Sequence, residues 1–341
     1  MKRLIALLLL AALLLSGCAP APKEKKQYTA TFLTLFDTVT TITGFAESPE
    51  AFRETTQGIH DALLEYHQLF DIYHDYEGIA NLKTVNDNAG IAPVTVDGRI
   101  ISLLQDCRRY WEETGGAVNA AMGSVLALWH EARNESINDP VHAFVPDAAA
   151  LEEASMHTDF ASVIVDEAAS TVYLADPMLR LDVGAIAKGW AAQAVAETAP
   201  SGLLISVGGN VCATGPKTEE GTPWVVGIQA PRGEADEYLH TVYVTKGCVV
   251  TSGDYQRVYT VDGQSWHHII DPETRYPAAY WQSVTILCED SGLADALSTA
   301  LFVLPLEEGQ ALLDRYGAEA LWVDTSGKEY QSPGLSAMIR T

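Results

Sequence analysis

Hydrophobic positions recur along the chain with two different periods, which predicts both helices and strands. Apolar residues spaced like one face of a helix predict helices over 49–71, 98–113, 186–197, 293–303 and 306–315. Ser48 suits the N-cap of the first helix, and Pro49 suits its first turn. Short apolar runs predict strands at 38–45, 163–166, 171–174, 203–207, 224–228, 240–244, 248–251, 257–261 and 284–287.

The order of these elements indicates the fold class. In the second half of the chain several predicted strands follow one another without a helix between them, which favours antiparallel pairing. We therefore expect an α+β fold of mixed, largely antiparallel sheets flanked by helices. A loop rich in Gly and Asn is expected over 78–90, and Gly115-Gly116 should end the second helix.

The first eighteen residues have the pattern of a bacterial export signal. Lys2 and Arg3 precede an apolar run over 4–15, which as a helix would span about 18 Å and is too short for a hydrocarbon core of about 30 Å. The run ends in the letters LSGC at 15–18, which resemble a lipobox. The alternative is an ordinary signal peptide with a chance cysteine.

These features predict the domain organisation and the location. We expect a signal peptide over 1–17, a lipidated tether over 18–30 whose lysines face anionic headgroups, and a folded domain over 31–341. Acyl chains on Cys18 would anchor the protein to the extracytoplasmic face of the bacterial cell membrane.

Composition narrows the function classes. The chain has 48% hydrophobic residues, so it is expected to fold, and its net charge is −24. Without a basic cluster beyond the N-terminus, such a surface is not suited to nucleic acid. An anionic ligand would have to be held by a metal ion, a helix N-terminus or a few placed cations.

The cysteines after Cys18 are expected to pack in the core and not to bind a metal ion. They stand singly in apolar stretches and lack the paired spacing of a zinc site. We expect buried free thiols, with disulfides as the alternative, at Cys107, Cys212, Cys248 and Cys288.

Two glycine-containing segments could contact a ligand. At 181–189 a predicted strand runs into a helix, and Gly184 would let a ligand approach the backbone, although a plain turn explains the same pattern. At 206–210 a strand leads into a glycine turn, which is either a hairpin or a ligand contact. This turn lacks the glycine spacing of a dinucleotide-binding fold.

Two polar segments could carry chemistry. His267 and His268 would point to opposite faces of a strand, so at most one could serve a given site; a surface histidine beside a packed one is the alternative. On the predicted helix over 293–303, Asp295 and Thr299 share one face and could both ligate a hard cation such as Mg²⁺. A surface carboxylate beside a threonine bonded to its own helix is the alternative for this pair.

Taken together and in this order, the segments resemble the ApbE family of FAD:protein FMN transferases (flavinyltransferases). The specific matches are LDVGAIAKGWA, SVGGNVCATG, TSGDYQRVY, HHIIDP and DALSTALFV, with weaker ones in LFDTVTTI, FDIYHDYEGIANL and ETGGAVNAAMGSVLALW. The resemblance covers nearly all of the chain after the tether. It implies an ApbE-like, T-fold-type domain. Its cofactor would be Mg²⁺, and its substrate would be FAD. FMN would move to a Thr or Ser hydroxyl of an acceptor protein as a phosphoester, with release of AMP.

The resemblance also implies roles for particular residues. Asp295 and Thr299, with the Ala185 carbonyl, would hold Mg²⁺, which makes Asp295 essential to catalysis. His268 would be the base that takes the proton of the acceptor hydroxyl. FAD would be bound by Phe36, Tyr73, Asn119, Ala120, Ala121, Asp182, Lys188 and Ile270.

Three departures from the family pattern affect these expectations. The letters VNAA at 118–121 replace Phe-Asp-x-Thr, which removes a carboxylate and a hydroxyl near the flavin. Arg275 stands where a glycine is usual, and Phe36 where methionine is frequent. An FAD pyrophosphatase that forms FMN and AMP, and a non-catalytic flavin-binding lipoprotein, are the rival functions.

Overall fold

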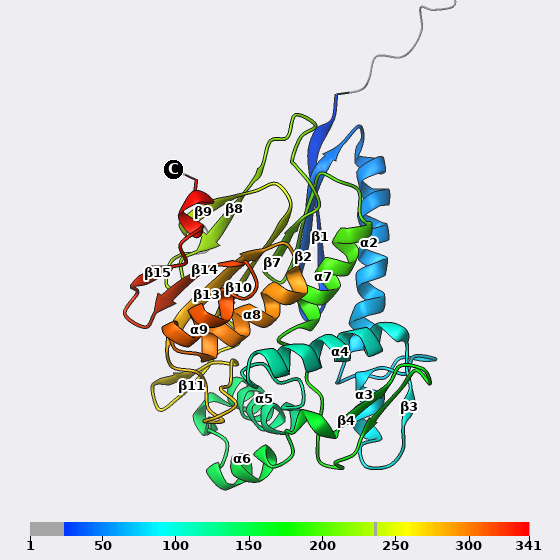
Figure 1. Ribbon diagram of the computed structural model, residues 1–341, viewed down its shortest axis with the longest axis vertical. Helices are drawn as coiled ribbons and strands as arrows, with labels where there is room; N and C mark the ends of the chain where they lie inside the picture. The colour runs from blue at the N-terminus through cyan, green and yellow to red at the C-terminus, as the bar shows by residue number, and fades with distance from the viewer. Residues whose placement is uncertain (1–23, 235–236, 341) are drawn as a thin grey trace, which may run out of the picture.

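The computed structural model describes residues 24–234 and 237–340 (Figure 1). The predicted signal peptide and the predicted lipid attachment site Cys18 lie outside these residues. In the described part of the chain, no helix is long and apolar enough to cross a membrane.

One antiparallel sheet of eight strands forms the centre of the fold (Figure 1). Thr40 of its second strand pairs with Val207 of its third, so the sheet joins segments that are far apart in sequence. The strand order across the sheet is β1 (Lys26–Leu35), β2 (Thr38–Ala46), β6 (Leu203–Val207), β7 (Asn210–Ala213), β10 (Gly247–Gly253), β13 (Trp281–Cys288), β14 (Glu319–Asp324) and β15 (Glu329–Gln331).

The first strand corrects the predicted domain boundary. β1 pairs with β2 from Lys26 onward, so residues 26–30 belong to the folded domain and the prediction of a tether reaching residue 30 is wrong. Tyr28 on this strand packs against Phe52 of the following helix, with ring centroids 5.7 Å apart. Tyr28, Ala30 and Phe32 alternate with exposed residues as a strand requires, but the lysines just before them made the start of β1 look like part of the tether.

Both faces of the large sheet are covered. Helices pack on one face, where they share the main hydrophobic core with the sheet; these are α2 (Pro49–Phe70), α7 (Ala187–Thr198), α8 (Ser291–Val303) and α9 (Leu306–Leu313). The other face packs against the hairpin of β8 (Trp224–Gln229) and β9 (Tyr238–Val244), beside the short helix η3 (Leu335–Ala337). The sheet is thus the middle layer of the molecule.

A second, more helical part is formed by the chain between α2 and α7 (Figure 1). It consists of α3 (Leu82–Asp87), β3 (Val94–Thr95), α4 (Gly98–Glu113), α5 (Gly123–Asn138), η1 (Pro140–His142), α6 (Ala148–Ser155), η2 (Phe160–Ser162), β4 (Val163–Asp166) and β5 (Thr171–Leu174). The hairpin of β11 (Tyr259–Val261) and β12 (Gln264–Trp266) packs on α5.

The predicted fold class is confirmed, with corrections to individual elements. The loop expected over 78–90 contains α3, which begins with a capping box of Asn81 and Thr84. The strand expected to begin at Arg257 begins at Tyr259, because Arg257 has a φ of +46° that a strand does not accommodate. The four later cysteines have free thiols, as expected, and only Cys288 among them is not fully buried.

Candidate active site

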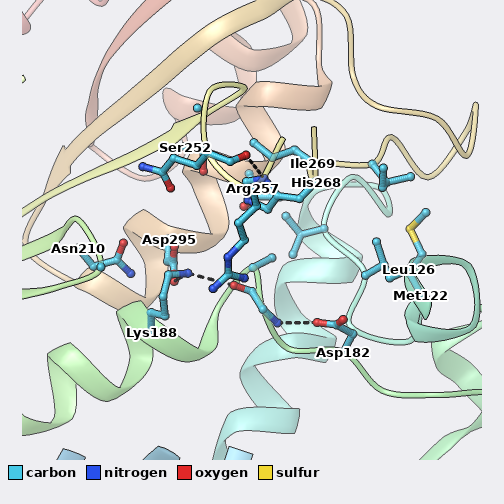
Figure 2. Close-up of a pocket in the computed structure, with 18 of the residues that line it drawn as sticks. Met122, Leu126, Asp182, Lys188, Asn210, Ser252, Arg257, His268, Ile269 and Asp295 are labelled. Atoms are coloured by element: carbon cyan, nitrogen blue, oxygen red, sulfur yellow. Dashed lines mark hydrogen bonds and ion pairs between the residues drawn. The ribbon is translucent and has the colours of Figure 1, made fainter. Parts of the chain in front are cut away.

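Two adjoining cavities lie where the large sheet meets the helical part. The larger has a volume of about 310 Å³ and the smaller about 120 Å³. Both are lined by Asp37, Asp182, Gly184, Lys188 and Arg257, so they form one continuous hollow. Figure 2 shows that its walls come from segments spread over most of the chain.

The structure brings most of the predicted site residues together here. The larger cavity is lined by Asn119, Asp182, Ala185, Lys188, His268, Ile270, Asp295 and Thr299. The smaller one is lined by Phe36 and Tyr73, together with Asp182 and Lys188.

Ala120 and Ala121 do not line either cavity, and this part of the prediction is wrong. Both side chains are buried in the core behind the wall. The Ala120 carbonyl accepts a hydrogen bond of 2.8 Å from the backbone N–H of Asp182. The stretch therefore supports a site residue from behind.

Asp295 occupies a buried corner of the larger cavity on α8. Its Oδ2 accepts a hydrogen bond of 2.8 Å from the backbone N–H of Gly189, and the Nζ of Lys188 lies 3.6 Å from the same oxygen. Burial raises the pKa of Asp295, and Lys188 and the Gly189 N–H oppose this by favouring the charged carboxylate. A cation bound beside Asp295 would further stabilise the negative charge of this buried carboxylate.

The oxygen donors of this corner fit a hard cation. Ala185, Asp295 and Thr299, which carry a backbone carbonyl, a carboxylate and a hydroxyl, line the same cavity. Within residues 24–234 and 237–340, no group of three or more His, Cys, Asp or Glu side chains could hold a metal ion. An ion with a single protein carboxylate, which completes its shell with water and substrate phosphates, is typical of Mg²⁺.

The segment before α7 is a tight turn and not the predicted strand. The Oδ1 of Asp182 accepts a hydrogen bond of 2.9 Å from the N–H of Gly184. Lys188 in turn donates to the Gly184 carbonyl at 3.1 Å. α7 begins at Ala187, so the turn places Asp182 and the first turn of the helix on one wall.

His130 of α5 lines the smaller cavity and lies between Tyr73 and this turn. Its Nδ1 lies 2.8 Å from the hydroxyl of Tyr73, and its Nε2 lies 3.9 Å from Oδ2 of Asp182. Burial lowers the pKa of His130, which keeps the ring neutral. The helix that carries it, α5, was not predicted, because its apolar residues only weakly favour one helical face.

The two adjacent histidines point in different directions, as expected, although they lie in a bend and not in a strand. His267 bonds with the Ala278 carbonyl at 2.9 Å and packs against Phe302. His268 lines the larger cavity, and its Nδ1 donates to the Gln256 carbonyl at 3.1 Å. The Nε2 of His268 is therefore the nitrogen with a free lone pair.

His268 is neutral in this environment. Burial lowers its pKa to about 3, and the positive charges of Arg257 and Lys188 contribute to the shift. Neutral imidazole is the form that can accept a proton.

The departures from the family pattern have local explanations. Asn119 uses both ends of its amide within the protein, because its Oδ1 accepts from Ala121 N–H at 2.9 Å and its Nδ2 donates to the Thr158 carbonyl at 2.8 Å. Arg275 has a φ of +65°, a backbone conformation that glycine adopts easily and arginine does not. The chain therefore makes the same kind of turn although arginine stands in the place of glycine. Its carbonyl accepts from Nε1 of Trp129 at 2.9 Å, and its side chain is not part of the cavity wall.

Arg257 and Asn210 line the cavity but were not among the residues predicted for the site. Arg257 borders both cavities, and Asn210 lies near Asp295 (Figure 2). Both stand inside the quoted segments TSGDYQRVY and SVGGNVCATG, which was the available signal. The sequence alone does not show whether these two polar side chains face a cavity or the solvent.

Comparison with known proteins places the chain in a family. The profile of the ApbE family matches residues 36–322. A curated relative from Treponema pallidum (strain Nichols), named FAD:protein FMN transferase, is 37% identical over 277 residues, which is 76% of this chain and 75% of the relative. A relative of the same name from Klebsiella pneumoniae (strain 342) is 33% identical over 277 residues, with 77% of this chain and 83% of the relative covered.

Solved structures have the same fold. The crystal structure of the ApbE protein from Thermotoga maritima has a TM-score of 0.81 and 30% identity, and covers 93% of this chain and all of that one. The flavin transferase ApbE from Vibrio cholerae has a TM-score of 0.75 at 22% identity, with 92% of this chain and 100% of that one covered, which supports the fold alone.

Proposed function

The chain belongs to the ApbE family and is an FAD:protein FMN transferase, and we propose that the larger cavity performs this reaction with Mg²⁺. In the proposed reaction a Thr or Ser oxygen of the acceptor forms a bond to the FMN phosphorus. The bond between that phosphorus and the oxygen bridging the two phosphates breaks, and AMP leaves. The observation that carries the proposal is the convergence of Asp182, Lys188, His268 and Asp295 from separate segments on one cavity.

We assign the metal to the corner formed by Asp295, Thr299 and the Ala185 carbonyl. When bound there, Mg²⁺ would offset the negative charge of the FAD diphosphate. Lys188 lies on the same side, where its ammonium group can contact a phosphate oxygen. Gly189 lets α7 approach α8 closely enough for its N–H to fix the Asp295 carboxylate.

His268 is assigned the proton transfer. Its Nδ1 is held by the Gln256 carbonyl, so Nε2 is left to accept the proton of the acceptor hydroxyl. Positioning of that hydroxyl in line with the phosphorus would provide most of the remaining rate enhancement.

The flavin nucleotide is assigned to the continuous hollow. Phe36 and Tyr73 supply aromatic surface in the smaller cavity, and Ile270 and Asn119 border the larger one. Asp182 borders both cavities, so it is placed to contact the nucleotide where the two join.

We further propose that the enzyme is lipid-anchored through Cys18 on the extracytoplasmic face of the cell membrane. Its acceptor would then be an exported protein or a membrane redox protein with a flavinylated Thr or Ser. Replacing Cys18 by Ala should release the enzyme from membranes while its transferase activity on a soluble acceptor fragment is kept. Retention on the membrane after a high-salt wash would contradict the lipid anchor.

The reaction is tested by incubating the enzyme with FAD, Mg²⁺ and a Thr-containing acceptor fragment. Covalent flavin fluorescence on the acceptor in a denaturing gel is the expected result, and omission of Mg²⁺ with a chelator should abolish it. Free FMN and AMP without labelled acceptor would indicate a pyrophosphatase. Unchanged FAD would indicate a protein that only binds the flavin.

A further inference from the structure

Arg257 lies in the loop between β10 and β11 and is the one residue that borders the two cavities from this loop. Figure 2 shows its side chain extending into the middle of the pocket, toward Lys188. Among the residues the structure describes, the guanidinium group has no hydrogen bond or ion pair. Its five N–H donors are therefore available to a ligand.

The backbone of Arg257 supports a role in ligand binding. Its φ of +46° lies in the left-handed region, which costs a non-glycine residue about 1–2 kcal/mol. Strain of this kind persists where the surroundings enforce it, and it is frequent at ligand sites. The adjacent carbonyl of Gln256 bonds to His268, so the same loop also orients the proposed base.

A second donor without a partner borders the same cavity. Asn210 is 2% exposed, and its Nδ2 makes no well-formed hydrogen bond within the described residues, although the amide faces the Asp295 carboxylate closely enough to favour its charged form and oppose the rise in its pKa. It follows the Gly208-Gly209 turn between β6 and β7, which directs it toward the corner of Asp295 (Figure 2). A buried amide of this kind has a free-energy penalty of about 1–3 kcal/mol unless a ligand pairs with it.

These donors indicate an anion with several acceptor oxygens. The surface as a whole does not attract one, since the net charge is −24. A guanidinium fork matches two oxygens of a phosphate group, and an amide donor matches a third.

We propose that Arg257 and Asn210 bind the diphosphate of FAD, with Arg257 paired to its non-bridging oxygens and Asn210 donating to the same group from the opposite wall. The proposal rests on FAD as the substrate of the proposed function. It assigns binding of the diphosphate to the protein itself, in addition to the metal corner at Asp295. A carboxylate of the acceptor protein is the competing anion.

The environment of His268 is consistent with this assignment. After burial, Arg257 and Lys188 are the main groups that lower its pKa. A diphosphate placed between these cations would offset their charge and bring the pKa of His268 nearer to its ordinary value, where a base is more effective.

The test compares ligands with and without the diphosphate. Dissociation constants of FAD, ADP and riboflavin are measured by fluorescence or calorimetry for the wild type, Arg257→Gln, Arg257→Lys and Asn210→Ala, in chelator and in Mg²⁺. Arg257→Gln should weaken FAD and ADP by about tenfold or more and riboflavin by less than about twofold. The dissociation constants of Arg257→Lys for FAD and ADP should lie between those of the wild type and Arg257→Gln. Asn210→Ala should weaken the binding of FAD and ADP by about three- to tenfold.

Arg53→Gln on the exposed surface of α2 is the matched control and should change none of the constants. Equal losses for FAD and riboflavin would show that Arg257 only shapes the loop, and would overturn the proposal. Unchanged FAD binding with a raised KM for the acceptor would assign Arg257 to the acceptor instead. Because the dissociation constants are measured without an acceptor, a wild type that binds FAD but does not transfer FMN would contradict the proposed function and leave the binding test intact.

Discussion

The Nζ atom of Lys188 lies 3.6 Å from the Oδ2 atom of Asp295, so a cation of α7 faces the buried carboxylate of α8. The pair explains how an acidic side chain can lie in the core before any metal binds. It also places the charge that would bind Mg²⁺ at the floor of the larger cavity.

Asp295→Asn should abolish transfer and leave the fold intact. The variant lacks the one side-chain carboxylate assigned to Mg²⁺, whereas its neutral amide suits a site where burial already raises the pKa of the acid. In thermal unfolding, Mg²⁺ with FAD should stabilise the wild type and have little effect on the variant. Normal turnover of Asp295→Asn without excess Mg²⁺ would contradict the metal assignment.

Gly189→Ala should destabilise the protein by about 1–3 kcal/mol. A Cβ atom at position 189 would lie 2.2 Å from the Ser291 carbonyl oxygen, so α7 and α8 would have to separate and the bond to Asp295 would weaken. Urea unfolding measures the loss. Gly58→Ala on α2 is the control, because nothing lies within 4 Å of its new Cβ; it should stabilise by up to about 1 kcal/mol.

His268→Ala should lower the rate of transfer by about 10²-fold or more while FAD still binds, because only the proton acceptor is lost. His267→Ala should lower it far less, since that ring packs against Phe302 away from the cavity. Single-turnover transfer and FAD titration separate the two effects. Small and equal losses in both variants would rule out the base role.

The stability of the protein should fall as the pH drops from about 6.5 toward 3. The pKa of His268 is about 3 in the folded protein, so in this range the unfolded chain binds a proton that the folded chain does not. The contribution is fully present above pH 6.5. His268→Gln should show a shallower acid dependence of the unfolding free energy, and an identical dependence would argue against a depressed pKa.

Arg275→Gly should raise the stability by about 1 kcal/mol. Arg275 has a φ of +65°, which glycine adopts without the steric cost borne by other residues. The turn itself would be retained, since its N–H and carbonyl bond to Asp271 and Trp129 through the backbone. Denaturant unfolding measures the gain; a loss of stability would show that the arginine side chain contributes packing that outweighs the strain.

The sequence predicted the parts of the site that depend on local spacing. Asp295 and Thr299 share a helical face because they are four residues apart. The other predicted site residues came from the resemblance to the family, which rested on the motifs and their order. Local patterns did not reveal that Arg257 points into the cavity or that Ala120 and Ala121 lie behind its wall, because these directions depend on packing between distant segments. The start of β1 was missed because the lysines before it made it look like part of the tether, and α5 was missed because its apolar residues only weakly favour one helical face.

The pairing of Thr40 with Val207 affects when the cavity can form as the protein is synthesised and folds. Neighbouring strands of the central sheet enclose the whole helical part as a loop, so folding has to close long-range contacts before the cavity exists, and such topologies fold slowly. No fragment that lacks either β2 or α8 contains a complete nucleotide site. We therefore expect flavin binding only after α8 has been synthesised and the sheet has closed around the helical part, so a newly made enzyme should take up no FAD before that point.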